Sequence, residues 1–447
     1  MHKSISRREL LKLLALVVGK VGLGTLTGCK PLAGRAAEGL EPRAYLPLVM
    51  GGESSAVIPT PTSSVILPTL TNTPTATATT TNTPTTTATP TITPTPSSGG
   101  GRVVHVRDIG VTSWDYGDTY YGNYVNQARV DTMVDQGVMA LTNAASLAQA
   151  WQTLVPGYAP GKAIAIKVNF NNNYQTCNST NLELDALIHP INALIKGLLV
   201  AYPNFQTSDI WIYDATGQAY PDWGPRNVNT RFKAGCLYPG VRYFDYFCNE
   251  KAGYTTTNPS ANVVWHNPSG IATPPSGIKV TDVLVDATYV INIPIVKRHW
   301  GTGVTLAFKN HFGSIENCYP LHDWVYGWES HYGGVAYNPV VDVYRNANIA
   351  GKTVLVMGDA LFGNWENNYS KAKPWVTFGN RAPDSLLFAT DPVAIDCVMC
   401  DLLNAEWQLD SIADHYLVYA NTVGLGTYER GDPWGSGYNL IDYVYLS

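Results

Sequence analysis

Short apolar runs alternate with longer helical patterns from residue 102 to the C-terminus, and this alternation most constrains the fold. Runs such as AIAIKVNF, DIWIYDATG and YVINIPIVK have the β-branched composition of buried strands. Helical patterns lie near residues 124–139, within 183–202, near 225–234, 303–312 and 338–348, and from Pro392 onward. The order predicts an α/β domain with a largely parallel sheet flanked by helices.

Polar side chains stand where the strand-like runs end. Because ligands bind at the carboxyl ends of parallel strands, these side chains predict one crevice. Asp391, directly before Pro392, also has the sequence of a helix N-cap. The residues concerned are Lys167, Asn169, Asp214, Lys297, His299, Asp359 and Asp391.

The stretch IVKRHWGTGVTLAFKNHFG, residues 295–313, concentrates positive charge in a chain that is sparing with it. Side chains alternate along a strand, so Lys297 and His299 should share one side while Arg298 faces the other. Lys297, His299 and Lys309 together indicate a site for a carboxylate or phosphate. The alternative is a solvated basic face with a core histidine.

The turn within this stretch adds a second expectation. Gly301 and Gly303 permit a tight turn whose N–H groups, with the start of the following helix, could hold an anion. Thr302 adds a hydroxyl there. Lys309 lies about two turns along the predicted helix, and its side chain would lean back toward the same place.

Four motifs resemble the domain of unknown function 362 family, in order and spacing, over roughly residues 102–420. The resemblance adds Asn310 and Asp396 to the candidate site and implies no reaction, because the family has no established activity. Some relatives carry an iron–sulfur module, but this sequence has no C-x-x-C-x-x-C run. The motifs are IAIKVNF around Lys167, INIPIVKRH, TLAFKNHFGS with Lys309-Asn310, and ATDPVAIDCVMCDLL with Asp391 and Asp396.

Residues 1–29 resemble a twin-arginine-type lipoprotein signal. Arg7 and Arg8 precede an apolar run that is too short and interrupted to span a bilayer stably. The run ends in LTGC, which resembles a lipobox and makes Cys29 the expected lipidation site. An ordinary cleaved signal is the alternative. The twin-arginine route carries folded proteins, commonly with a cofactor, which favours a bound metal or cofactor.

Residues 30–101 are expected to form a disordered, Thr/Pro-rich linker. The segment from Pro59 to Pro96 is almost only threonine, proline, alanine and asparagine, which cannot bury a core. Its prolines favour an extended stalk that would hold the globular domain, residues 102–447, away from a membrane. No role can be read for the apolar patch AYLPLVM at residues 44–50.

Charge and cysteine content narrow the class of protein. A net charge of −5 with 14% charged residues excludes a basic nucleic-acid binder. In an oxidising compartment Cys236 and Cys248 are close enough in sequence to form a disulfide. Cys397 and Cys400 fall well inside a predicted helix and are interpreted as core residues.

A metal site is the other chemistry that the sequence raises. Four histidines fall in one segment, but none has H-x-x-x-H or H-x-H spacing, which disfavours a zinc site. His322 and His331 lie in an aromatic, loop-like stretch where surface histidines are common. Binding of a divalent cation by Asp214, Asp359 or Asp391 stays open. The four histidines are His299, His311, His322 and His331.

The leading hypothesis is an exported, lipid-anchored enzyme for a small anionic substrate. Lys167, Lys297 and Lys309 would bind the anion, and His299 would act as general acid and base. A non-catalytic cell-surface lipoprotein that captures an anionic ligand is the alternative.

Overall fold

The structure is a computed structural model that describes residues 101–217, 224–367, 369–409 and 412–447. The predicted signal with Cys29, the predicted linker up to Gly100 and the patch at residues 44–50 lie outside these residues. None of the helices in the described part combines the length and apolar character that a membrane span requires.

A mixed sheet of 11 strands forms the centre of the described part of the chain. Its order is β11-β1-β10-β9-β6-β2-β3-β4-β5, and β7 pairs with β8 and β9. The strands are β1 (Arg102–Arg107), β2 (Ile164–Lys167), β3 (Ile210–Tyr213), β4 (Arg242–Asp245), β5 (Glu250–Lys251), β6 (Tyr289–Asn292), β7 (Ile295–His299), β8 (Gly303–Val304), β9 (Thr353–Asn364), β10 (Ser385–Ala389) and β11 (Asp442–Leu446).

Most neighbouring strands are parallel, which confirms the predicted α/β class with a largely parallel sheet. β2 runs parallel to β3 and β6, and β9 runs parallel to β6 and β7. β10 is antiparallel to both β1 and β9, and the short strand β8 is antiparallel to β7. The carboxyl end of β10 therefore lies at the edge of the sheet opposite to those of β2 and β3.

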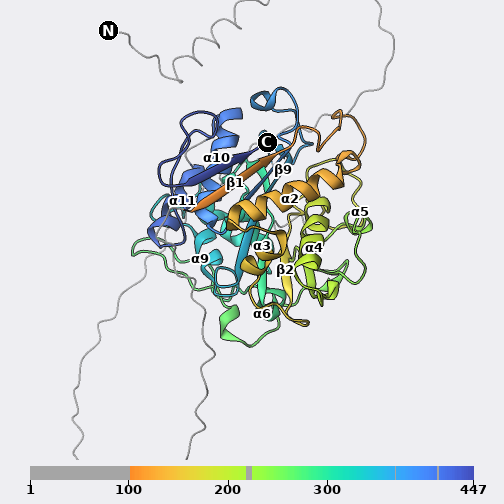
Figure 1. Ribbon diagram of the computed structural model, residues 1–447. Coiled ribbons are helices and arrows are strands. Elements are labelled where there is room, and N and C mark those ends of the chain that lie inside the picture. The colour runs from red at the N-terminus through yellow and green to blue at the C-terminus, as the bar shows by residue number, and fades with distance from the viewer. Residues whose placement is uncertain (1–100, 218–223, 368, 410–411) are drawn as a thin grey trace, which may run out of the picture. The chain divides into compact units, whose positions relative to one another are not determined.

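Helices cover both faces of the sheet (Figure 1). α2, α3 and α4 pack on one face, over a core that includes Ile164 and Ile166 of β2. The intervening Ala165 belongs to the core on the other face, where α9, α10 and α11 pack. The helices are α2 (Gln127–Thr142), α3 (Leu147–Leu154), α4 (His189–Ala201), α5 (Thr230–Ala234), α6 (Asp282–Asp286), α7 (Ala307–Asn310), α8 (His322–Val325), α9 (Pro339–Arg345), α10 (Pro392–Glu406) and α11 (Ile412–Thr422).

The predicted helix at residues 303–312 is largely wrong. Gly303 and Val304 form strand β8, which turns back antiparallel onto β7. Gly303 has a φ of +78°, a conformation that suits this turn and disfavours a helix start. A helix forms only at Ala307–Asn310, as α7, followed by a 3-10 turn over His311–Ser314.

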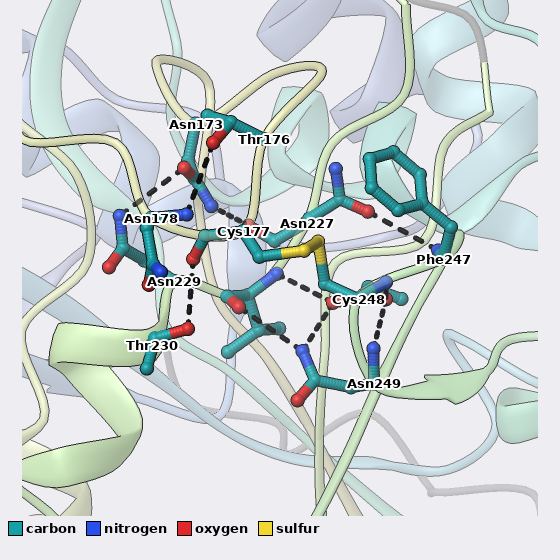
Figure 2. Close-up of a disulfide and its surroundings, with 12 residues drawn as sticks. Asn173, Thr176, Cys177, Asn178, Asn227, Asn229, Thr230, Phe247, Cys248 and Asn249 are labelled. Carbon is teal, nitrogen blue, oxygen red and sulfur yellow. Dashed lines mark hydrogen bonds between the residues drawn. A yellow bond between two sulfur atoms is a disulfide. The ribbon is translucent and has the colours of Figure 1, made fainter.

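The disulfide pairing also differs from the expectation. Cys177 bonds to Cys248, whereas Cys236 is unpaired and donates from its thiol to the Tyr238 carbonyl. The bond ties the loop after β2 to the loop after β4 (Figure 2). Asn173 reinforces the connection: its Nδ2 donates to the Asn227 carbonyl at 2.6 Å, and its Oδ1 accepts from Asn229. Cys397 and Cys400 are buried within α10, as expected.

Replacing both bonded cysteines, Cys177→Ser with Cys248→Ser, should lower the free energy of unfolding by up to about 4 kcal/mol. The reason is that the bond closes a loop with a sequence separation of 71 residues. Urea denaturation under oxidising conditions measures the change. Cys236→Ser is the matched control and should cost little. A loss for Cys236→Ser as large as that of the double variant would contradict the Cys177–Cys248 pairing.

Candidate functional site

A cavity of about 200 Å³ opens where β2, β3 and β7 end. Six residues predicted from the sequence line it, contributed by the strand ends and by α7. Their side chains are at most 7% exposed, which excludes the alternative of a solvated basic face. These residues are Lys167, Asn169, Asp214, His299, Lys309 and Asn310.

Lys167 and Asp214 form a buried ion pair on one wall of the cavity. The Lys167 Nζ lies 3.3 Å from Asp214 Oδ1, and Asp214 Oδ2 accepts from the Phe170 N–H at 2.8 Å. Burial lowers the pKa of Lys167, while the Asp214 carboxylate acts in the opposite direction. Gly313 packs against the pair, and a Cβ there would lie 2.1 Å from Asp214 Oδ1 and 2.5 Å from Lys167 Nζ. The pair therefore requires glycine at this position.

A chain of asparagine side chains joins the strand ends behind this wall. Asn310 Nδ2 donates to Asn292 Oδ1 at 2.8 Å, and Asn310 Oδ1 accepts from Asn169 Nδ2 at 3.2 Å. Lys297 Nζ donates to Asn169 Oδ1 at 2.9 Å. Lys297 does not line the cavity but is linked to it through Asn169. Burial lowers the pKa of Lys297, and the nearby Asp185 carboxylate opposes that shift.

Two cations face the cavity without an acceptor among the described residues. Lys309 Nζ makes no hydrogen bond there and lies 3.9 Å from the centre of the Phe312 ring. Arg226 is 3% exposed, and its Nη1 has no hydrogen-bond partner. The Thr305 hydroxyl, also on the cavity wall, has none either. Burial lowers the pKa of Lys309 to about 8.

Hydrogen bonds from the turn after β7 fix the tautomer of His299, which lines the cavity. Its Nδ1 lies 3.1 Å from the Gly301 N–H and 3.3 Å from the Thr302 N–H, so this nitrogen must accept. The proton of the neutral ring is then on Nε2. Burial and the Lys309 charge hold the pKa of His299 well below its usual range. This tautomer does not suit the general base expected from the sequence, because its lone pair is already engaged by the turn.

His322 has the opposite tautomer. Its Nδ1 lies 3.0 Å from the Tyr319 carbonyl oxygen, which can only accept, so Nδ1 carries the proton. The lone pair of the ring is therefore on Nε2. His322 lines the cavity and is 7% exposed, which corrects its interpretation as a surface histidine. Burial and Lys309 hold its pKa well below the usual range, so the imidazole is neutral at neutral pH.

The predicted anion site at the glycine turn is also wrong, since the protein's own side chains occupy its donors. The turn N–H groups donate to His299, as described. The N–H groups of Ala307 and Phe308, at the start of α7, donate to the Asp396 carboxylate at 2.8 and 3.3 Å. Asp396 also accepts from the Tyr416 hydroxyl. Asp396 thus orients α7 and does not reach the cavity.

Three further candidates lie outside the cavity. Asp391 caps α10 through the Val393 and Ala394 N–H groups, at the sheet edge opposite to the site because β10 is antiparallel. Asp359 is not at a strand end, because β9 continues to Asn364. The Thr302 hydroxyl donates to the Val304 carbonyl within the turn.

Five further residues line the cavity that the sequence analysis did not assign to the site: Arg226, Cys318, His322, Trp300 and Tyr326. Arg226 fell inside a predicted helix, but α5 begins only at Thr230. Cys318 is buried, and burial raises the pKa of its thiol. Cys318 and His322 are four residues apart in the sequence, but no sequence pattern places these two residues near the lysines.

Within the described residues, no group of three or more His, Cys, Asp or Glu side chains is arranged to hold a metal ion. The hypothesis of a divalent cation or another cofactor stays untested.

The fold and the cavity define an α/β protein with a buried cationic site. Residues 244–401 match the family described as Domain of unknown function (DUF362), which supports assigning this segment to that domain family. The match is narrower than the resemblance read from the sequence, and Lys167 and Asp214 precede it. No curated protein matches the chain.

Gly313→Ala should destabilise the protein by about 3 kcal/mol, because the added Cβ forces the buried Lys167–Asp214 pair apart. Urea denaturation at neutral pH measures the loss. In a Lys167→Met, Asp214→Leu background the same substitution should cost less, since no ion pair is left to separate. An equal cost in both backgrounds would show that Gly313 is required for another reason.

Proposed function

We propose that this protein is an enzyme that acts on a small anionic substrate, a carboxylate or phosphate, in the cavity between β2, β3, β7 and α7. The observation that carries the proposal is the pair of buried cations, Lys309 and Arg226, that lack acceptors among the described residues. Burying an unpaired charge costs several kcal/mol, so these side chains are best explained by an anion that they bind.

The balance of charge in the cavity supports the same conclusion. Among the described residues, three cationic side chains, Lys167, Arg226 and Lys309, line the cavity together with one carboxylate, that of Asp214. Asp214 is engaged by Lys167, which leaves the other two cations for a ligand. A volume of about 200 Å³ is below the roughly 300–1,000 Å³ typical of sites for drug-sized ligands, so the substrate is small.

The two cavity histidines suggest how catalysis would proceed. His322 lines the cavity and carries its ring proton on Nδ1, and its lowered pKa keeps it neutral, so we assign it the role of accepting a proton from the substrate. His299 would donate a hydrogen bond from Nε2 and stabilise developing negative charge. In this assignment His299 is a hydrogen-bond donor, and the base role that the sequence suggested for it belongs to His322.

The alternative function is a non-catalytic binding protein for an anionic ligand. It would use the same cations, and His299 as a hydrogen-bond donor suits it equally well. The two functions differ at His322: a base is needed only for turnover, so His322→Gln would abolish catalysis while leaving ligand affinity nearly unchanged.

We place this activity outside the cytoplasm, on a lipid anchor at Cys29. The Cys177–Cys248 disulfide supports an oxidising compartment, since such bonds persist in exported proteins. Arg7, Arg8 and the LTGC motif are the sequence basis for export and lipidation.

Lys309→Met should weaken sulfate binding at least roughly tenfold, the scale of a lost charge-assisted hydrogen bond. Isothermal titration calorimetry with sulfate as probe measures this at pH 7. Without sulfate, the variant should be as stable as the wild type or more so, because an unpaired buried charge is removed. Lys251→Met, at an exposed lysine on β5, is the matched control and should leave affinity unchanged.

The pH dependence of sulfate binding tests the same site independently. Sulfate keeps its charge across the range, whereas Lys309 loses its proton near pH 8. Affinity should be level below pH 8 and fall above it. Without ligand, the unfolded chain holds this proton up to about pH 10.5, so the contribution of Lys309 to stability rises between pH 8 and 10.5. No measurable binding of sulfate, phosphate or acetate, or equal sulfate affinity at pH 7 and 10, would refute the anion site.

Cys29→Ser should release the protein from membranes, because the lipidated residue would be absent. Cell fractionation followed by immunoblotting measures the distribution. Cys236→Ser is the control and should stay with the membrane fraction. Unchanged membrane association of Cys29→Ser would overturn the lipoprotein assignment and leave the cavity proposal untouched.

A further inference from the structure

Three aromatic side chains, Trp300, Tyr326 and Trp328, form a cluster at the cavity, referred to below as the aromatic cluster. The Trp300 and Trp328 rings are stacked, with centroids 5.1 Å apart and planes at 20°. Tyr326 packs against both, at 5.3 and 5.0 Å. Trp300 and Tyr326 also line the cavity, so the cluster and the cationic site are continuous.

The cluster is exposed although it is apolar. Trp300 is 47% exposed and Trp328 is 54% exposed. Grouped exposed aromatic rings mark a binding surface more often than scattered ones do. The polar edges of both indoles are already engaged, because Trp328 Nε1 donates to Glu329 at 3.0 Å and Trp300 Nε1 contacts the Tyr369 hydroxyl at 3.5 Å. The Trp300 ring is also stacked on the His299 ring, with centroids 6.4 Å apart and planes at 12°, so the cluster offers a ligand the exposed parts of its indole rings.

The turn after β7 holds the cluster in place. Tyr326 is 6% exposed and packs on Gly301, where a Cβ would lie 2.4 Å from its ring. The Gly301 N–H also donates to His299. The same turn thus fixes the donor histidine and the aromatic surface, so both are preorganised for one ligand.

We propose that the ligand is a small organic anion that carries an aromatic ring. Its anionic group binds Lys309 and Arg226 in the cavity, and its ring stacks on Trp300 at the edge of the aromatic cluster. This inference rests on the proposed function, because it assumes that the cations bind an anion. It adds that the ligand has a flat apolar part, since stacking favours ring faces and the cluster offers no unengaged indole N–H for a sugar hydroxyl.

Two matched pairs of probes test the inference by isothermal titration calorimetry on the exported protein. Phenyl phosphate is compared with inorganic phosphate, and benzoate with acetate. In one pair or both, the ring should improve affinity at least roughly fivefold, the scale of one aromatic contact. Binding of the phosphate pair would identify the anionic group as a phosphate, and binding of the benzoate and acetate pair would identify it as a carboxylate.

Variants at Trp300 assign the gain to the cluster. Trp300→Ala should reduce the ratio of the affinities for the ring-bearing and the ring-free anion to about one, and Trp300→Phe should retain part of that ratio. Trp407→Ala is the control, because Trp407 is also 47% exposed and does not line the cavity. Its affinities should equal those of the wild type.

Negative results would distinguish a failure of the anion site from a failure of the aromatic-ligand inference. Binding of inorganic phosphate or acetate with no gain from the ring overturns the aromatic ligand and leaves the anion site intact. A sugar phosphate such as glucose 6-phosphate binding as tightly as phenyl phosphate also overturns it. Absence of binding by all four probes overturns the anion site and the inference together.

Discussion

The organisation of this protein depends on the burial of positive charge. Lys167, Arg226, Lys297 and Lys309 are each at most 7% exposed, in a protein interior where an ammonium or guanidinium group is costly. Asp214 compensates Lys167 through an ion pair, and the asparagine chain holds Lys297. Lys309 and Arg226 are left with their charge directed at a cavity. Burial lowers the pKa values of both side chains, because it disfavours their charged forms.

Contacts elsewhere in the fold fix the positions of the segments that carry these cations. Asp396 reaches from α10 to the first N–H groups of α7, the helix that carries Lys309. Gly313 lets the following backbone approach the Lys167–Asp214 pair. The Cys177–Cys248 disulfide fastens the loop after β2, which bears Asn169, to the loop after β4 (Figure 2). Asn173 of the loop after β2 donates to the carbonyl of Asn227, the residue that follows Arg226. Residues outside the cavity therefore determine the positions of these charges.

The two histidines show how hydrogen bonds outside a cavity set the chemistry inside it. A backbone carbonyl forces the proton of His322 onto Nδ1, and two backbone N–H groups force that of His299 onto Nε2. The same side chain thereby carries its proton on Nδ1 at one position and on Nε2 at the other. Both lie beside Tyr326, which connects the polar cavity to the aromatic cluster.

The sequence by itself determined the α/β class and the residues at the ends of β2, β3 and β7, because period-two alternation and a polar residue after an apolar run are local signals. It also indicated the N-cap at Asp391. Only the tertiary structure decided that β10 is antiparallel, which moves Asp391 to the far edge, and that Cys177, not Cys236, meets Cys248. Arg226, His322 and Tyr326 belong to the site for the same reason: contacts between distant segments depend on strand order and loop packing, which no local pattern encodes.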